Sequence, residues 1–262
     1  MPERTGYKHG VPSWVDLGTT DVEGAKAFYA GLFGWTSEDL PTDMGMAYTM
    51  FSKNGKAVAG GGPLPQETAA RGEPSRWQSY INVDSVDETV AKVEAAGGGV
   101  MVPAMDVMTS GRMAFITDPA GGAIGLWQAG DHIGAELVNE AGALTWNELM
   151  TDDPVKVQQF FADAIGWESQ IEEIPQGDYT FFKVGDDVIA GMMEKTPDMG
   201  PVPNYWNIYF AVADCESDAA KITELGGTVI AKPFDTPFGR MAVVQDPQGA
   251  AFSIIQPNQP GE

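Results

Sequence analysis

WVDLGTTDVEGAKAFYAGLFGW, residues 14–35, is the stretch that decides the fold, because the chain contains it twice. The second copy, WNELMTDDPVKVQQFFADAIGW, spans residues 146–167, and eight of the 22 aligned positions are identical without a gap. Each copy predicts a strand, an acidic helix cap, an amphipathic helix and a Gly-Trp stop. A repeated unit buries its apolar face against neighbouring units, so the repeat predicts a chain built from equivalent modules.

The helix in each copy has recognisable ends. Asp21 is expected to be the N-cap of the first helix, because its carboxylate can accept a free backbone N–H group, and Gly34 is expected to end it. Asp153-Pro154 gives the second helix a cap and a proline at its first position. One helical stripe is apolar and predicts the buried face of the first helix: Ala25, Phe28, Tyr29 and Leu32.

Later segments repeat in the same order. WQSYINV at 77–83 is answered by WNIYFAV at 206–212, and GRMAFITDPAG at 111–121 by GRMAVVQDPQG at 239–249. Each half therefore predicts two strand-helix-three-strand units, which makes four in the chain. We expect an N-terminal domain at 1–128, a linker at 129–142 and a C-terminal domain at 143–262, with 1–12 a loose arm and 63–76 a Pro-bounded loop.

Composition narrows the class of partner. The chain has 262 residues, with 15 Lys and Arg against 37 Asp and Glu, for a net charge of -22. Such a field repels nucleic acids and anionic membranes, and an anionic ligand would need a local arginine. Cys215 is the single cysteine, so no intrachain disulfide can form. Without a signal-like start or a run of about 18 apolar residues, a cytoplasmic protein is expected.

The repeated segments resemble the vicinal oxygen chelate superfamily, which contains glyoxalase I, bleomycin-resistance proteins and extradiol dioxygenases. Asp21 to Trp35, its copy Asp153 to Trp167, and the two GR…DPxG segments carry the resemblance. Within the superfamily, the chain resembles two-domain actinobacterial members described as hydroxylase-like or glyoxalase-like. It implies an α+β fold in which four βαβββ modules pair into two glyoxalase-like domains, each a curved, mostly antiparallel sheet around a cavity. A shared fold does not by itself define the reaction.

The superfamily also implies a place for a divalent metal. Metal-using members carry a His in the first strand of a unit and a Glu in its last strand, so that two units supply four ligands. No His or carboxylate stands at the matching positions, which are Trp14, Gly60, Gln78 and Gly125 in the first half and Trp146, Gly191, Asn207 and Ser253 in the second. His9 and His132 lie outside the strand units and are expected to be solvated. We therefore predict no metal and no other cofactor.

Strand alternation suggests which side chains could form a pocket instead. In the second half Trp146 and Glu148 share one strand face, and Asn207 and Tyr209 share the matching face of another, with Arg240 near the rim. The first half offers Trp14, Asp16, Gln78, Tyr80 and Arg112. A structural alternative is that Arg240 and Arg112 simply pair with Glu148 and Asp16.

Other apolar residues are assigned to the core or to the pocket wall. Trp77 and Trp206 fall on the opposite strand face and are predicted to be core. The methionines near loops, Met44, Met46, Met108 and Met199, either form an adaptable apolar wall or fill gaps.

Three functions fit these patterns. The first is binding of a small oxygenated or aromatic metabolite without a metal. The second is a metal-independent lyase or hydroxylase-like enzyme, with Glu148 as base and Tyr209 or Arg240 stabilising an oxyanion. The third is a protein-interaction scaffold with vestigial cavities. A small-molecule partner is expected, and a monomer could suffice because two units complete one cavity.

Overall fold

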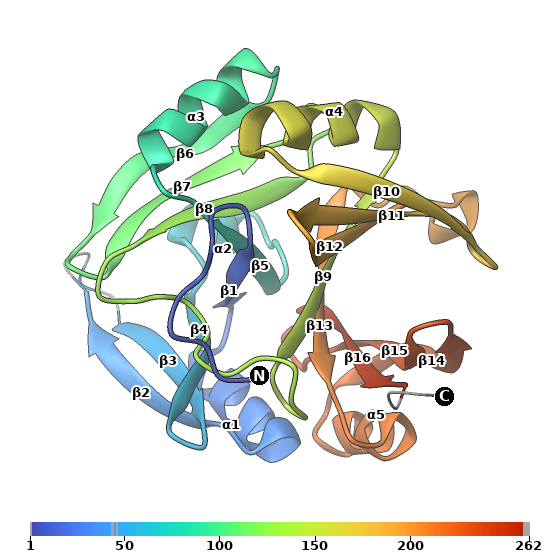
Figure 1. Ribbon diagram of the computed structural model, residues 1–262. Coiled ribbons are helices and arrows are strands. Elements are labelled where there is room, and N and C mark those ends of the chain that lie inside the picture. The colour runs from blue at the N-terminus through green and yellow to red at the C-terminus, as the bar shows by residue number, and fades with distance from the viewer. Residues whose placement is uncertain (1, 43–44, 46, 259–262) are drawn as a thin grey trace.

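The computed structural model describes residues 2–42, 45 and 47–258, which form two eight-stranded sheets, one from each half of the chain (Figure 1). The first sheet consists of β1 (Pro12–Thr19), β2 (Thr36–Pro41), β3 (Ala47–Lys53), β4 (Lys56–Pro63), β5 (Arg76–Asn82), β6 (Gly99–Val107), β7 (Gly111–Thr117) and β8 (Ala123–Ala129). The second consists of β9 (Leu144–Thr151), β10 (Glu168–Ile174), β11 (Gly177–Val184), β12 (Asp187–Glu194), β13 (Tyr205–Ala211), β14 (Thr228–Thr236), β15 (Gly239–Gln245) and β16 (Ala251–Pro257).

The strand orders show the duplication directly. They are β2-β3-β4-β1-β5-β8-β7-β6 and β10-β11-β12-β9-β13-β16-β15-β14. In each sheet two four-stranded modules meet at an antiparallel central pair, β1 with β5 or β9 with β13. Within a module the first and last strands pair in parallel, as β1 does with β4. The predicted α+β fold of four βαβββ modules in two glyoxalase-like domains is confirmed.

One helix belongs to each module: α1 (Val22–Phe33), α3 (Val86–Ala95), α4 (Pro154–Ile165) and α5 (Cys215–Glu224). The predicted caps are confirmed, because Asp21 accepts from the Gly24 N–H group and Gly34 has a left-handed φ of 71°. The short α2 (Gln66–Ala70) lies inside the segment predicted as loop, and a 3-10 turn η1 occupies Pro197–Met199. Of the helices in the described ranges, none combines the length and the apolarity that a membrane crossing requires.

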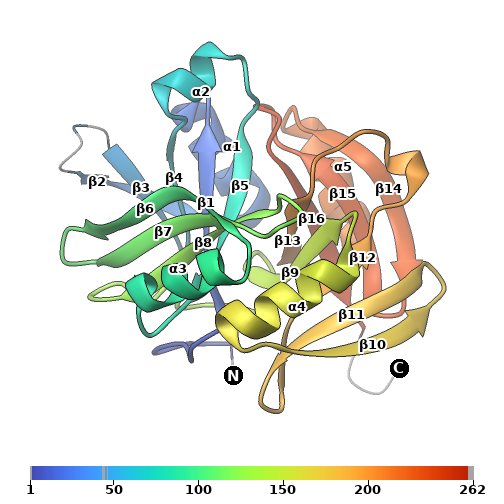
Figure 2. The ribbon, with the colours of Figure 1, turned by 90° about the horizontal axis from the view of Figure 1, so that it is seen from above.

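The two halves share their cores. One large cluster joins α1 and Trp77 to Phe210 and α5, and the other joins α3 to α4 and Trp206. In both views α3 lies beside α4, and α1 lies near α5 (Figures 1 and 2). Trp77 and Trp206 are 7% exposed, as expected for core residues. Each half therefore buries apolar helix surface of the other, which couples their stability.

The prediction of a loose N-terminal arm is wrong. The Tyr7 hydroxyl donates to the Ala135 carbonyl at 2.5 Å, and the Asn82 amide donates to the Tyr7 carbonyl at 3.0 Å. The indole of Trp167, the last residue of the second repeat, donates to the Gly10 carbonyl at 2.7 Å. Trp35 donates in the same way to Gly142 at 2.7 Å. The tryptophans that end the two repeats thus hold the N-terminal arm and the linker in place by hydrogen bonds. The polar composition of residues 1–12 suggested a loose arm, because it does not show that backbone carbonyls of this segment accept such bonds.

Candidate functional site

A cavity of about 360 Å³ opens against the second sheet. Aromatic and methionine side chains form most of its wall: Trp146, Met150, Tyr179, Phe181, Met193, Met199, Tyr205, Tyr209, Phe234, Phe238 and Met241. A few polar side chains face it as well: Thr145, Glu148, Gln176, Asn207 and Thr236. Apolar walls with a small number of polar groups are typical of sites for small organic ligands.

The register of the central strands gathers the predicted residues. Trp146 lies opposite Tyr209, and Glu148 lies opposite Asn207. Because side chains two residues apart share a sheet face, all four line the same cavity. The Asn207 amide donates to the Ser253 hydroxyl at 2.9 Å, which orients it.

Glu148 is the buried acid of this cavity, with a residue exposure of 7%. Its two carboxyl oxygens accept hydrogen bonds from different phenols, Oε2 from Tyr179 at 3.0 Å and Oε1 from Tyr209 at 3.1 Å. The Trp146 indole donates to the Tyr179 hydroxyl at 2.9 Å. Burial raises the pKa of Glu148 to about 7, although the two phenol donors oppose this rise. A carboxyl of this kind can exchange a proton near neutral pH.

Tyr179 is the member of this cluster that the sequence prediction missed. A signal for it exists, because YTFF at 179–182 repeats YTMF at 48–51. In the first half Tyr48 takes the equivalent place. The Tyr48 hydroxyl donates to Asp16 at 2.5 Å, and the Tyr80 hydroxyl donates to its other oxygen at 2.9 Å. A pair of phenols that donate to one acid thus occurs in both halves of this chain.

The first half differs in the number of donors that its acid has. The Trp14 indole lies 2.9 Å from both Asp16 Oδ1 and the Tyr48 hydroxyl, so it gives Asp16 a third donor. Burial raises the pKa of Asp16, and the Tyr48, Tyr80 and Trp14 hydrogen bonds oppose it. Trp14 and Tyr80 belong to a buried cluster with Phe115, Trp127, Ala135 and Val138. The protein's own side chains therefore occupy this sheet face.

The linker contributes His132 to this packing. The imidazole lies edge-on to the Trp14 ring with 4.4 Å between centroids, and it also contacts Trp127 at 5.7 Å. Burial lowers the pKa of His132 to about 4, so the ring is neutral at physiological pH. His9 is half-buried and accepts from the Asp84 N–H group at 3.1 Å. The expectation of two solvated histidines is wrong. His132 packs against Trp14 and Trp127, and His9 forms hydrogen bonds with the backbone of Asp84 and Ile165.

The positions that correspond to metal ligands are crowded by tyrosines. A Cβ atom at Gly60 would lie 1.8 Å from the Tyr48 hydroxyl oxygen, and one at Gly191 would lie 1.9 Å from that of Tyr179. A Cβ atom at Gly125 would lie 2.2 Å from the Tyr80 ring. Glycine leaves the space that these phenols fill.

The remaining donors do not suit a divalent ion. Each cluster offers one carboxyl group together with phenols and an indole, whereas such ions take several N/O donors converging on one point. In the parts of the chain that the structure describes, no three His, Cys, Asp or Glu side chains are grouped for metal binding. The superfamily's metal therefore does not fit these residues.

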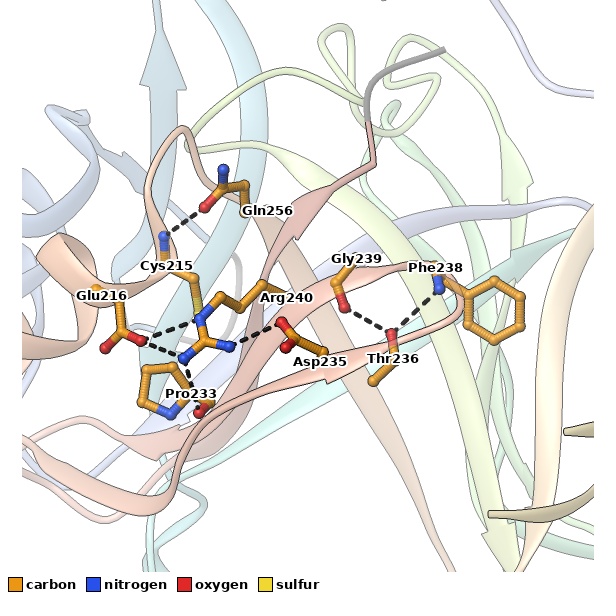
Figure 3. A network of polar contacts seen from close by, with 9 residues as sticks. All are labelled: Cys215, Glu216, Pro233, Asp235, Thr236, Phe238, Gly239, Arg240 and Gln256. Atoms are coloured by element: carbon orange, nitrogen blue, oxygen red, sulfur yellow. Dashed lines mark hydrogen bonds and ion pairs between the residues drawn. The ribbon is translucent and has the colours of Figure 1, made fainter. Parts of the chain in front are cut away.

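The expected roles of the two arginines are wrong. Arg240 donates through Nε to Glu216 at 3.0 Å and through Nη1 to Asp235 at 2.7 Å (Figure 3). Arg112 pairs likewise with Asp87 at 2.9 Å and Asp106 at 2.7 Å. Along β15 the side chains of Met241 and Val243 line the cavity, so alternation turns Arg240 to the opposite face, toward the start of α5. Neither arginine pairs with Glu148 or Asp16.

The other predicted residues are accounted for. Gln78 is half-buried and lies opposite Asp16 in the β1–β5 register. Of the loop methionines, Met199 lines the cavity and Met108 is exposed. Met44 and Met46 lie outside the described residues.

Comparison with protein families covers both halves. Residues 12–126 match the family model of the Glyoxalase/Bleomycin resistance protein/Dioxygenase superfamily, and residues 143–255 match that of the Glyoxalase-like domain. "Putative glyoxylase CFP32" of Mycobacterium tuberculosis (strain CDC 1551 / Oshkosh) is 50% identical over 260 residues, which cover 98% of each chain. "Anthracycline biosynthesis protein DnrV" of Streptomyces peucetius is 36% identical over 96% of this chain and 95% of its own.

A solved structure has the same architecture at low identity. The 2,3-dioxygenase LapB from Pseudomonas sp. KL28 superposes with a TM-score of 0.65 over 97% of this chain and 94% of its own, at 15% identity. At this identity the likeness concerns the fold alone.

Proposed function

Because the chain belongs to the Glyoxalase/Bleomycin resistance protein/Dioxygenase superfamily, while its central residues do not suit that superfamily's metal, we propose that it binds a small oxygenated aromatic metabolite in the cavity of its second half. The observation that carries this proposal is a single buried carboxyl group, Glu148, set in an otherwise aromatic and methionine-rich wall.

The wall suits a flat ligand. Phe181 and Phe238 contact each other at 5.8 Å between ring centroids, and Tyr179 contacts both rings. Offset and edge-on ring contacts of this kind extend readily to an aromatic guest. Met193 and Met241 have flexible, polarisable side chains that adapt to its outline. The Asn207 amide has a second N–H group beside the one that it donates to Ser253, and this group supplies a donor for a ligand oxygen.

The name of one relative agrees with this class of ligand. One relative is named for anthracycline biosynthesis and is 36% identical along nearly the whole chain. Anthracyclines are planar, oxygen-rich aromatic molecules. Since one half of a single chain contains the whole cavity, a monomer suffices for binding.

A thermal-shift titration with 1,8-dihydroxyanthraquinone tests the proposal. A ligand that binds only the folded protein raises its melting temperature in a saturable way. Phe181→Ala removes one aromatic ring from the cavity wall and should reduce the rise in melting temperature. Met50→Ala is the matched control, because Met50 holds the equivalent place in the YTMF repeat and packs against the filled cluster of the first half. An equal loss in both variants, or no shift in the wild type, would contradict the proposal.

A second function is favoured by the ionisation of Glu148. With its pKa near 7, this carboxyl could act as a general base on a bound ligand, and the Tyr209 hydroxyl could stabilise a developing oxyanion. Turnover of a methylglyoxal hemithioacetal by the purified protein tests for such an activity. Glu148→Gln should abolish it, whereas unchanged turnover in this variant would remove Glu148 from the mechanism. If no ligand shifts the melting temperature and no substrate turns over, an interaction scaffold becomes the better explanation.

A further inference from the structure

Asp16 and Glu148 differ in how much of their hydrogen-bonding capacity is used. An ionised carboxylate has about four acceptor sites. Asp16 accepts from Tyr48, Tyr80 and Trp14. Glu148 accepts only from Tyr179 and Tyr209 in the described part of the chain, because the Trp146 indole is directed to the Tyr179 hydroxyl. Glu148 lines an open cavity, so its spare acceptor sites are available to a ligand.

Glu148 also lacks a counter-charge. Among the described residues that line the cavity there is no Lys, Arg or His. The candidate cation, Arg240, is held by Glu216 and Asp235 on the other face of β15. A buried carboxylate without a cationic partner is unfavourable, and phenol donors compensate for only part of its lost hydration.

We infer that the cavity takes an aromatic ligand carrying a protonated amine, whose N–H group donates to Glu148 while its rings lie among Trp146, Phe181 and Phe238. The inference rests on the proposed binding function and adds the charge of the ligand. The ammonium group supplies the missing counter-charge and the missing donor together. Aromatic walls favour cations through their ring faces, and the protein's net charge of -22 attracts cations and repels anions.

The same arrangement makes binding depend on pH. The titratable groups facing Glu148 are the phenols of Tyr179 on β11 and of Tyr205 and Tyr209 on β13. Burial raises the pKa of each phenol, so all three remain neutral around pH 7. Glu148, with a pKa near 7, is thus the group that changes charge there. An ammonium ligand should bind more tightly at pH 8 than at pH 6, because it competes with a proton for the carboxylate.

Three fluorescent probes of similar three-ring shape separate charge from shape. 9-Aminoacridine is a monocation at these pH values, acridone is a neutral N–H donor, and 9-anthracenecarboxylate is an anion. We expect the order of affinity at pH 8 to follow that sequence in fluorescence titrations. Glu148→Gln keeps the side-chain shape and should weaken 9-aminoacridine about tenfold or more, as expected for loss of a charged hydrogen bond. It should leave acridone nearly unchanged.

Controls are built into the comparison. Glu148→Gln removes one of 37 acidic residues, so nonspecific attraction of the cation to the surface stays almost the same. The wild type provides a second readout, since 9-aminoacridine but not acridone should gain affinity between pH 6 and pH 8. If acridone binds but cation and anion bind equally, the charge inference fails and the proposed function stands. If none of the three probes binds, both fail.

Discussion

Asp16 and Glu148 hold equivalent places in the two halves of one chain, yet their surroundings differ. Asp16 has three donors and a filled apolar neighbourhood that includes Trp14, whereas Glu148 has two donors and faces a cavity of about 360 Å³. Duplication therefore preserved the acid and its two phenols. It changed what lies beside them, and under the proposed function this difference separates a structural centre from a binding site.

The two leading tryptophans should respond most differently to truncation. Trp14 is 3% exposed and packs against His132, whereas Trp146 is half-buried at the cavity. Trp14→Ala should lower the free energy of unfolding by about 3–5 kcal/mol, as large-to-small core substitutions do. Trp146→Ala should lower it clearly less, because its ring already borders open space. Urea unfolding of both variants measures this difference, and equal losses would mean that the first half is no better packed than the second.

The pH dependence of stability sharpens the contrast for Glu148. Its pKa rises from 4.5 in the unfolded chain to about 7 in the folded protein, so the folded state holds the proton more tightly. Stability is greatest below pH 4.5 as far as this group is concerned, falls as pH rises from 4.5 to 7, and is then constant. The fall corresponds to a difference on the order of 3 kcal/mol.

Glu148→Gln should remove this component from urea unfolding curves recorded across the pH range. Asp16→Asn serves as the matched variant, because it removes only the contribution of the first half. A wild-type pH profile that Glu148→Gln leaves unchanged would show that this carboxyl is not held in its protonated form.

A buried chain of hydrogen bonds is present in the core cluster around α1 and α5, but its equivalent is missing, within the described chain, from the cluster around α3 and α4. The Tyr29 hydroxyl accepts from Trp77 at 2.9 Å and donates to Asp246, of the other half, at 3.0 Å. Phe161 takes the equivalent place in the second repeat, with a similar edge-on contact to Trp206. Among the described residues, Trp206 Nε1 and Asp118 Oδ2 are buried without a partner.

Reciprocal substitutions test this asymmetry. Tyr29→Phe should cost about 1–3 kcal/mol, because it leaves two buried polar groups unpaired. Phe161→Tyr should stabilise the protein by about 1 kcal/mol, since its hydroxyl would reach both orphaned groups. Calorimetric melting of the two variants provides the measurement. Destabilisation by Phe161→Tyr would indicate that the second site lacks room for the hydroxyl.

The smallest effect is expected at the two arginines. Arg240 and Arg112 each bridge two exposed acids at the surface, and ion pairs of this kind contribute little. Arg240→Ala should therefore leave both stability and 9-aminoacridine affinity nearly unchanged. A large loss of affinity in this variant would bring Arg240 back into the site.

Much of this architecture could be predicted from the residues alone. The repeat at Trp14 and Trp146 predicts the modules, Asp21 and Gly34 predict the helix ends, and period-two alternation places Glu148 beside Trp146. The sequence prediction of ion-pair partners went wrong where a side chain has several possible partners that lie far apart in the chain. Arg240 is the clearest example, since nothing local shows that Glu216 on α5 lies beneath it.

The relation between the halves was also beyond prediction. Pairing of α1 with α5 and of α3 with α4 depends on how the two sheets pack, which no local pattern records. The linker helps to fill the face of the first sheet, because His132, Ala135 and Val138 pack there. In the sequence, His132 has no feature that distinguishes it from an ordinary loop residue. The YTMF and YTFF repeats, by contrast, contained a usable signal for Tyr48 and Tyr179.

The most direct test is a crystal structure of the protein with 9-aminoacridine bound. The account predicts one probe molecule per chain, lying in the second-half cavity with a nitrogen within hydrogen-bonding distance of a Glu148 carboxyl oxygen, while Asp16 keeps its hydrogen bonds from Trp14, Tyr48 and Tyr80. A probe bound against Asp16, or bound only at the surface with the second-half cavity empty, would contradict it.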